Sequence, residues 1–441
     1  MGFLDESLER GSSLKPDVIA CDAGSTDSGP FYLGSATPKM SRSAILQDVR
    51  RLLLARDQLK IPLIIGSCGT SGVDSGVEWM REMTLEIARE ECLSFKLGRV
   101  YSEQNPKLMA EAFQSGKIEP LPEAPEIDEQ IIQNCSHIVA MMGHEPIVHL
   151  LEEKCDVILC GRASDTALFA ALPLMRGFPA GPVWHCAKTI ECGAICSTAT
   201  GADGVYAEID DKSFTVEPLA LDAACTPHSL ASHTLYENKD PYLIREPSGT
   251  LDTQKASYLA ISERVTRVEG SEFYPERYTL KLEGAAFSGF QTVAIGGVRD
   301  PYILAQVDSW LAEMKLFFAE RLKELTGKTL GEEVQIDISQ YGRNAVMGKL
   351  EPLLEQIPHE LGLLFTVTAP EQTLANDVAR FVTHAASHWP ISEWDGFISG
   401  IAFPFSPPEI DRGPVYRFTL NHVLIPESPL SAFRFEVEDF Q

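Results

Sequence analysis

The sequence predicts an α/β protein with an N-terminal doubly wound, mostly parallel sheet and a second, α+β domain. From residue 16 to about 205, short apolar runs alternate with helical patterns, as in βαβ units. Four apolar runs lead directly into polar loops, at residues 18–20, 63–65, 138–142 and 157–160. Buried parallel strands have this form, and ligands bind at their carboxyl ends. If the four runs are neighbouring parallel strands, their loops form one site.

The helices expected between these strands follow from apolar residues spaced three or four apart. Pro173 is expected to end the last of them. A short strand is expected at residues 95–100, and a proline-rich surface loop at 118–127. The expected helices cover residues 41–59, 75–92, 105–116, 147–154 and 166–172.

The pattern changes near residue 205, where alternating strands replace the helices. Residues 204–209 and 213–216 read as a hairpin closed by 210–212. Further antiparallel strands are expected at residues 264–268, 277–282, 291–295, 334–338 and 363–368, with helices at 300–325 and 371–388 and a proline-punctuated tail after 404. The domains expected are therefore an N-terminal tail (1–15), an α/β domain (16–205) and an α+β domain (206–441), with a sub-boundary near 355–360.

Composition limits the classes of partner. The chain has 441 residues, 44% of them hydrophobic, and a formal net charge of -26. Such acidity disfavours nucleic acid and anionic membrane surfaces, which attract clustered Lys and Arg. No apolar stretch approaches the roughly 20 residues of a membrane span, and residues 1–15 lack the apolar core of a secretory signal. The ten cysteines are scattered without a CxxC pair, so we expect an intracellular, cytoplasmic protein.

The first polar loop, residues 22–29, is predicted to bind substrate or an anion. Glycine lets backbone N–H groups approach an anion, and hydroxyls add donors. Two alternatives stay open: the Asp-x-Gly-x-Thr phosphate hairpin of actin-like ATPases, and a plain turn capped by a side chain. The predicted binding residues are Asp22, Ser25, Thr26 and Asp27.

The second polar loop, residues 66–72, is a candidate carboxylate or phosphate cradle at a helix N-terminus. It matches neither a P-loop nor a dinucleotide fingerprint, and a plain turn is the alternative. Cys68 is expected to be a buried structural thiol rather than a nucleophile. The predicted binding residues are Ser67, Gly69, Thr70 and Ser71.

The third and fourth loops carry the expected acid–base groups. His144 and Glu145 are candidates for proton transfer, because a histidine titrates near neutrality. Arg162, with Ser164 beside it, offers a fork suited to a substrate carboxylate; its alternative is a salt bridge to Asp22 or Asp27. Asp165 is predicted either as a base or as a helix cap.

Residues 184–193 concentrate titratable side chains. Lys188 is predicted to stabilise an enolate or oxyanion, and His185 and Glu191 to exchange protons; the alternative is a solvated strand face. No metal-ligand spacing is evident. A Mg²⁺ site built from Asp22, Asp27 and Asp165 would be chemically reasonable. Weaker polar signals, for which structural roles are favoured, occur at 281–285, 342–344, His233, Tyr236 and Glu237.

Several motifs, taken in order, resemble the acyclic terpene utilisation (AtuA-like) family over residues 16 to about 435. The resemblance implies catabolism of branched acids, with a small carboxylate or acyl-CoA substrate. It also implies a small ferredoxin-like domain or protein; because the chain ends at Gln441, we expect a separate partner. The motifs are Asp22-Ala23-Gly24-Ser25-Thr26-Asp27-Ser28-Gly29-Pro30, Gly161-Arg162-Ala163-Ser164-Asp165, Leu235-Tyr236-Glu237 with Asp240-Pro241, Lys281-Leu282-Glu283-Gly284, and Phe403-Pro404-Phe405-Ser406-Pro407-Pro408-Glu409-Ile410.

The convergence of acids, hydroxyls and one arginine favours an enzyme of carboxylic-acid or acyl-CoA catabolism. The reaction expected is proton abstraction next to a carboxylate or thioester carbonyl, as in a hydratase, dehydratase or other lyase. Two alternatives remain: a phosphotransferase or ATPase that uses the Asp22–Thr26 loop, and a non-catalytic subunit of a two-component enzyme. A homo-oligomer is expected.

Overall fold

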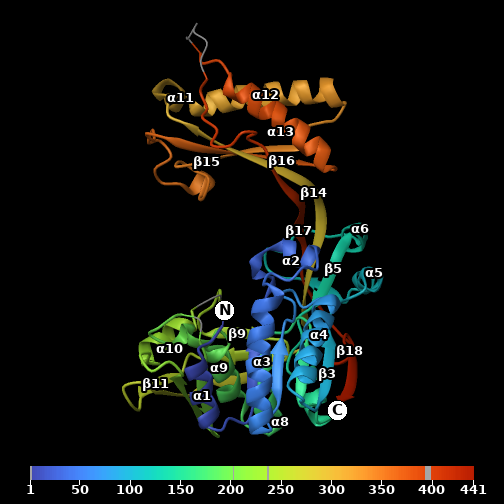
Figure 1. Cartoon of the computed structure of the whole chain (residues 1–441), viewed down its shortest axis with the longest axis vertical. Helices are drawn as coiled ribbons and strands as arrows, with labels where there is room; N and C mark the ends of the chain where they lie inside the picture. The colour runs from blue at the N-terminus through green and yellow to red at the C-terminus, as the bar shows by residue number, and fades with distance from the viewer. Residues whose placement is uncertain (1, 202, 236–237, 393–398) are drawn as a thin grey trace. The chain divides into compact units, whose positions relative to one another are not determined.

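A computed structural model describes residues 2–201, 203–235, 238–392 and 399–441. It confirms a mixed α/β fold (Figure 1). The chain divides into two compact units: unit 1 comprises Met1–Ala286 and Phe418–Gln441, and unit 2 comprises Phe287–Arg417. This division differs from the boundary expected at residue 205. Among the described residues, no helix combines the length and the apolar character needed to cross a membrane.

A five-stranded sheet organises unit 1. Its order is β1-β2-β6-β3-β18, and all neighbours are parallel except β18, which pairs antiparallel with β3. Alternate residues of β2 face two separate cores. Leu63 and Ile65 pack with α3 (Arg42–Leu59) and α4 (Asp74–Glu90). Ile64 packs with α7 (Glu145–Glu152), α8 (Asp165–Met175) and α9 (Ala180–Ile190). The sheet is therefore covered on both faces. The strands are β1 (Ile19–Asp22), β2 (Leu63–Gly66), β3 (Phe95–Tyr101), β6 (Val157–Cys160) and β18 (Arg434–Phe440).

The five helices expected between the strands are present in order, and unit 1 also contains α1, α2, α6, α9 and α10, which were not expected. Pro173 lies inside α8 instead of ending it, because burial of Ala171 and Leu172 in the core shared with α9 offsets the missing backbone bond. Residues 184–190 are helical, and residues 184–189 are buried, so the alternative of a solvated strand face is wrong for this segment. The helices are α1 (Asp5–Ser13), α2 (Pro30–Gly34), α3 (Arg42–Leu59), α4 (Asp74–Glu90), α5 (Pro106–Gln114), α6 (Glu129–Gln133), α7 (Glu145–Glu152), α8 (Asp165–Met175), α9 (Ala180–Ile190) and α10 (Pro227–His233).

The run at residues 138–142 does not join the parallel sheet. It belongs to β5 (Cys135–Ala140), which pairs antiparallel with the first part of β14 (Leu280–Val298). An apolar run fixes burial but not the pairing partner, so this part of the prediction is wrong. The loop beyond β5 still meets the sheet, because Met142 forms a parallel bridge with Ala163 and donates its N–H to the carbonyl of Arg162.

The remainder of unit 1 consists of small antiparallel sheets. β7 (Val205–Ile209) and β8 (Ser213–Pro218) form the expected hairpin. They belong to a sheet of order β11-β12-β8-β7, with β11 at Ser257–Ala260 and β12 at Thr266–Glu269. A second sheet has the order β13-β10-β9, with β9 at Leu243–Glu246, β10 at Gly249–Asp252 and β13 at Glu272–Pro275. β4 (Ile118–Pro120) pairs with the end of β17 (Ile410–Leu424).

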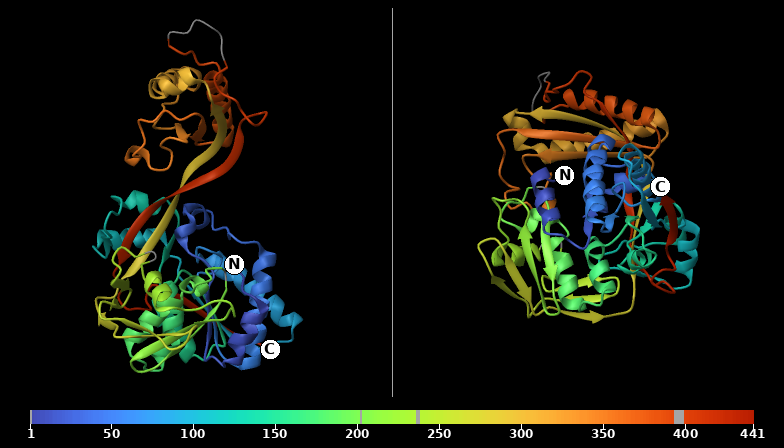
Figure 2. Two further views of the ribbon diagram at one scale, coloured as in Figure 1. Left: turned by 90° about the vertical axis from the view of Figure 1, so that its left-hand side faces the viewer. Right: turned by 60° about the horizontal axis from the view of Figure 1, so that its bottom comes forward.

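Unit 2 has a β-α-β-β-α-β connectivity. Its strands lie in the order β15-β16-β14-β17, and α12 and α13 lie on one face of the sheet (Figure 2). This is the split βαβ, ferredoxin-like arrangement. The topology that the family resemblance implies in a separate partner is thus present within this chain. The elements that follow β14 are α11 (Pro301–Ala305), α12 (Val307–Thr326), β15 (Gln335–Tyr341), β16 (Leu361–Ala369), α13 (Gln372–Ser387) and β17.

Three local expectations for the C-terminal half differ from the structure. The helix expected at 300–325 is divided at Gln306 into α11 and α12. The two strands expected at 277–282 and 291–295 merge into the single long strand β14. The proline-punctuated tail contains β17 and β18, and β18 completes the sheet of unit 1.

Gly72 permits the close approach of the two loops that follow β2 and β6. Its φ is +70°, and a Cβ atom there would lie 2.2 Å from the backbone nitrogen of Arg162. Ser102 links the same segments, because its hydroxyl donates to the Gly72 carbonyl and accepts from the Arg162 N–H. Glycine at position 72 therefore sets the position of Arg162.

Gly72→Ala is expected to destabilise unit 1 more strongly than Gly177→Ala. Gly177 also has a positive φ, of +82°, but nothing lies within 4 Å of its missing Cβ. Alanine at 177 should cost about 1–2 kcal/mol of backbone strain. Alanine at 72 should add about 1–3 kcal/mol of overpacking. Urea unfolding of both variants tests this, and equal losses would contradict it.

Candidate functional site

Arg162 lies at the centre of a buried cluster beyond the carboxyl ends of β1, β2 and β6. Only 4% of the surface of Arg162 is exposed to solvent. Its Nε donates to Glu283 at 3.0 Å, and one terminal nitrogen donates to Asp165 at 3.1 Å and Ser67 Oγ at 3.2 Å. The same nitrogen donates to the carbonyl of Ala163. We call Arg162, Ser67, Asp165, Glu283 and Asp22 the arginine cluster.

The charges in the arginine cluster determine its protonation states. Burial alone would raise the pKa of Glu283, but the nearby charges of Arg162 and Lys281 outweigh burial and lower that pKa to about 2. Lys281 Nζ lies 2.9 Å from the Glu283 carboxylate. Arg162 is likewise held in its charged form, because Glu283, Asp165 and Asp22 together outweigh the cost of burial. The Arg162–Glu283 pair is therefore permanently ionised.

Asp22 has the opposite character. Burial and the charge of Asp165 raise its pKa well above the usual value, although Arg162 and a hydrogen bond with Ser67 oppose the shift. Its Oδ1 atom is buried and has no hydrogen-bond partner among the described residues. The cluster thus contains more carboxyl groups than Arg162 can keep ionised.

Glu246, at the end of β9, joins a second group of polar side chains. Its two carboxyl oxygens accept hydrogen bonds from Ser164 Oγ at 2.8 Å and Thr166 Oγ1 at 2.7 Å. Burial, together with the charge of Asp165, raises the pKa of Glu246 to about 7, against the opposing effects of the two hydroxyls and Lys188. Glu246 therefore titrates near neutral pH.

Lys188 lies on α9, one helical turn before Glu191, and the two form a hydrogen-bonded ion pair. Their side chains are 9% and 4% exposed, respectively. Burial disfavours the ammonium, but the charge of Glu191 outweighs it and raises the pKa of Lys188. Lys188 is thus a buried, permanent cation in the electrostatic range of Glu246.

His144 and Glu145 begin α7 and lie beside a hollow of about 370 Å³. The Nδ1 atom of His144 lies 3.4 Å from Glu145, whose other oxygen accepts from the Tyr278 hydroxyl at 2.9 Å. Burial lowers the pKa of His144, although Glu145 opposes the shift. The His144 ring meets Trp184 edge-on at 5.5 Å between centroids. The remaining lining of the hollow is Val148, His149, Glu152, Ser428, Pro429 and Leu430, so no member of the arginine cluster borders it.

The loop at residues 66–72 is entirely buried. The N–H groups of Ser67, Cys68 and Gly72 donate to other backbone carbonyls. Thr70 Oγ1 accepts from the Lys39 N–H, and Ser71 Oγ donates to the carbonyl of Tyr32. Much of the predicted cradle is thus used to hold the loop itself. Anion binding by this loop, Gly69 included, stays a prediction.

The loop at residues 22–29 forms a local turn. Ser25 Oγ donates to the Asp27 carboxylate and accepts the Asp27 N–H, as expected for a capped turn. Thr26 is buried, and Asp27 is exposed. β1 continues into a 3-10 turn (Thr26–Ser28) and α2. The antiparallel hairpin required by the ATPase alternative is therefore not formed at this position.

The salt-bridge partners of Arg162 differ from those considered from the sequence, while substrate binding by Arg162 stays a prediction. Of the salt-bridge partners considered from the sequence, neither Asp22 nor Asp27 forms a salt bridge to it; its ion-pair partners are Asp165 and Glu283. The guanidinium group of Arg162 is therefore already paired with two carboxylates of the protein itself. Arg162 is placed to position Asp165.

Some residues of the site could not be recognised from sequence. Glu246 lies about 80 positions from its partners, in a short strand without a distinctive motif. Glu283 was detectable only within the polar segment 281–285.

The structure also places other residues that the sequence had named. His185 is fully buried, and burial lowers its pKa to about 3, so it remains neutral. Arg343 pairs with Asp308 within unit 2. Tyr236 and Glu237 lie outside the described residues.

The three carboxylates of the expected Mg²⁺ site do not gather. Among the described residues, the group whose metal-ligand atoms all lie within 4.8 Å of one another is Glu191, Cys192 and His233. Asp22, Asp27 and Asp165 do not form such a group, because Asp27 is turned into its own exposed loop. The expected magnesium site is therefore wrong in its residues.

Residues 54–203 match the family model of the acyclic terpene utilisation family protein AtuA. Over this range the chain is similar to that family. The match supports the resemblance there; it contains the motif Gly161-Arg162-Ala163-Ser164-Asp165 and Lys188 but neither Glu246 nor Glu283. No curated protein and no solved structure gives a match.

Glu246→Gln should change how the stability of the protein depends on pH. The folded protein holds the Glu246 proton more tightly than the unfolded chain, so this group's contribution to stability is lost as pH rises through about 7. Glutamine removes that titration. The free energy of unfolding of the variant should therefore rise relative to wild type from pH 4.5 to about pH 7, by at most about 1.4 kcal/mol per pH unit, and level off above that. Chemical denaturation across this range measures the difference.

Glu111→Gln, at an exposed position on α5, serves as the control. Its stability difference from wild type should stay constant over the same pH range. A Glu246→Gln difference that is equally constant would show that Glu246 does not titrate there.

Proposed function

We propose that the protein is an enzyme of carboxylic-acid or acyl-CoA catabolism that moves a proton at the carbon next to a carboxylate or thioester carbonyl. A hydratase, dehydratase or related lyase reaction is the form we favour. The observation that carries this proposal is the buried carboxyl group of Glu246, which Ser164 and Thr166 hold at the start of α8 and on which the charges of Asp165 and Lys188 both act. The family's description adds a link to acyclic terpene utilisation, whose breakdown yields branched acids.

Glu246 is the proposed general base and acid. A carboxyl group with a pKa of about 7 is substantially populated in both protonation states at neutral pH. Its hydrogen bonds to Ser164 and Thr166 fix the orientation of the carboxyl group. An ordinary exposed carboxylate would be too weak a base for a carbon acid.

Lys188 supplies the positive charge that such a reaction requires. When the base removes the α-proton, the electron pair moves onto the carbonyl oxygen, and a nearby ammonium stabilises that oxygen. In a dehydration, the electrons then return, the carbon–oxygen bond at the β-carbon breaks, and the hydroxyl takes up a proton and leaves as water. Glu246, which then carries the abstracted proton, is the group proposed to donate it to the leaving hydroxyl. Asp165, whose side chain is 26% exposed and paired with Arg162, is proposed to orient that hydroxyl by accepting its hydrogen bond.

The substrate class, the cellular compartment and the partners of the enzyme are also proposed. A small carboxylate or acyl-CoA is the proposed substrate class. None of the ten cysteines, all of which lie in the described residues, forms a disulfide bond. This fits a reducing compartment, and we propose the cytoplasm. A homo-oligomer and a small ferredoxin-like partner protein remain proposals.

Hydrogen–deuterium exchange at the α-carbon tests the chemistry without requiring the full substrate to be known. The protein in D₂O would be incubated with branched-chain acyl-CoA thioesters and the corresponding free acids, and deuterium incorporation would be followed by NMR. Wild type should label at least one compound. Glu246→Gln should reduce the labelling rate by about 10²–10⁴-fold, the usual contribution of a general base.

The control for this experiment is again Glu111→Gln, which should label at the wild-type rate. A Glu246→Gln protein that is folded and labels as fast as wild type would contradict the assignment of the base. Absence of labelling across the panel, together with tight binding of Mg-ATP, would contradict the reaction class.

A further inference from the structure

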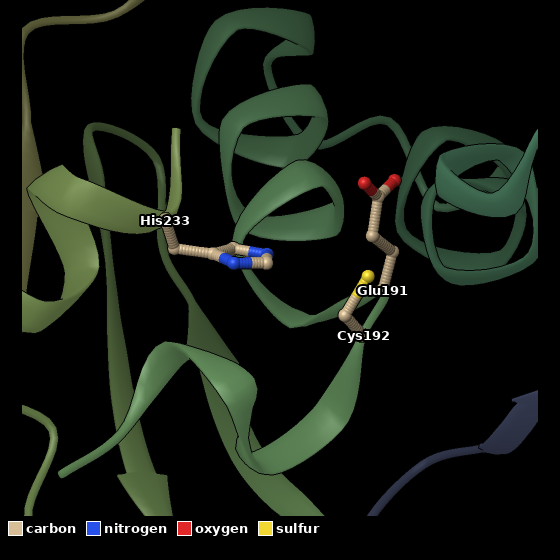
Figure 3. A group of neighbouring side chains, drawn as sticks. All are labelled: Glu191, Cys192 and His233. Atoms are coloured by element: carbon tan, nitrogen blue, oxygen red, sulfur yellow. The ribbon is translucent and has the colours of Figure 1, made fainter. Parts of the chain in front are cut away.

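Three side chains of types that bind metal ions lie close together beside Lys188. Glu191 and Cys192 follow α9, and His233 is the last residue of α10. Each offers one ligand atom, and these atoms all lie within 4.8 Å of one another. Figure 3 shows the His233 ring extending toward Cys192 and Glu191 from a separate part of the backbone.

We propose that Glu191, Cys192 and His233 bind a divalent transition-metal ion, with Zn²⁺ the ion that best fits these donors. Thiolate and imidazole are ligands that zinc prefers, whereas magnesium requires oxygen donors. This site differs in both residues and metal from the magnesium site expected from the sequence. The inference does not depend on the proposed proton-transfer function.

The geometry needs only a small adjustment to accept the ion. Tetrahedral zinc, with bonds of about 2.0 to 2.3 Å, places its ligand atoms about 3.3 to 3.8 Å apart. The observed limit of 4.8 Å exceeds this by about 1 Å, which rotation about the side-chain bonds of Cys192 and Glu191 can supply. Three protein ligands leave a fourth position for water or a substrate oxygen, as in catalytic zinc sites.

The surroundings favour a neutral imidazole and an enclosed ion. His233 is 4% exposed, and the Glu191 side chain is also 4% exposed. Cys192 is half-buried, so an ion can enter from its side. Such enclosure limits competition from bulk water for the ligand atoms.

The charged side chains around Glu191 include one that would repel a bound cation and two that would attract it. Lys188 opposes it, because its ammonium hydrogen-bonds to Oε1 of Glu191. The other carboxylate oxygen of Glu191 has no bond to Lys188 in the structure, so it remains the candidate ligand. Burial, together with the charges of Asp165 and Glu246, raises the pKa of Glu191 to about 8 against the effect of Lys188. A cation bound by Glu191 therefore displaces a proton from it at neutral pH.

Cobalt titration of the full-length, metal-depleted protein tests the site. Co²⁺ substitutes for Zn²⁺, and a cysteine ligand gives a thiolate-to-cobalt charge-transfer band that reports directly on the sulfur. Wild type should show this band with one equivalent of Co²⁺, and Zn²⁺ should abolish it by displacement. Mg²⁺ should do neither. Cys192→Ser should lose the band, and His233→Asn and Glu191→Gln should each weaken binding by at least about 10-fold, as is typical for loss of support at a metal site.

Two variants serve as matched controls. Cys92→Ser removes an exposed thiol, and His228→Asn removes another histidine of α10. Both should bind Co²⁺ as wild type does, and circular dichroism of each metal-free variant establishes that it is folded. A folded Cys192→Ser protein that keeps the charge-transfer band, or a wild-type protein that gives none, would overturn the proposal.

Discussion

The buried guanidinium of Arg162 is the constraint on which the site depends. A charge removed from water must have partners, and this one takes them from three separate parts of the chain: the loop after β2, the start of α8, and β14. The backbone had to bring these parts within hydrogen-bond distance. Gly72 allows that approach, because no side chain separates its loop from residue 162.

The same constraint explains the unusual carboxyl groups nearby. Burial and the charge of Asp165 raise the pKa of Asp22, and Arg162, whose charge is shared with Glu283 and Asp165, does not reverse that shift. Glu246 hydrogen-bonds to Ser164 and Thr166, on either side of Asp165, rather than to Arg162. Burial and the charge of Asp165 raise the pKa of Glu246 to about 7. A region with surplus carboxyl groups can bind protons or cations. The proton-transfer role of Glu246 and the metal site at Glu191 are two separate uses of this surplus.

The sequence predicted those parts of the fold that local patterns determine. Apolar runs and helical spacing identified β1, β2, β3 and β6 and their helices, and the loops after β1, β2 and β6 do carry the arginine cluster. The pairing of β5 with β14 was not predictable, because an apolar run is compatible with either sheet. The last strand, β18, was hidden in a tail whose prolines suggested a loop.

The site itself was only partly predictable for a related reason. Arg162, Asp165 and Lys188 stand out as charges next to predicted buried elements. Glu246 and His233 come from segments remote in sequence, and only tertiary contacts give them their environment. Sequence also could not reveal that Arg162 is already paired, because Glu283 reaches it from a strand more than a hundred residues away.

A double-mutant cycle between Arg162 and Glu283 tests the central claim most directly. Arg162→Met, Glu283→Gln and the double variant would be compared with wild type by chemical denaturation. The account predicts a coupling free energy of about 1 to 3 kcal/mol for this buried pair, against less than about 0.5 kcal/mol for the exposed Arg277–Glu119 pair of the same unit. A coupling indistinguishable from that of the exposed pair would contradict the claim that Arg162 and its carboxylates hold the site together.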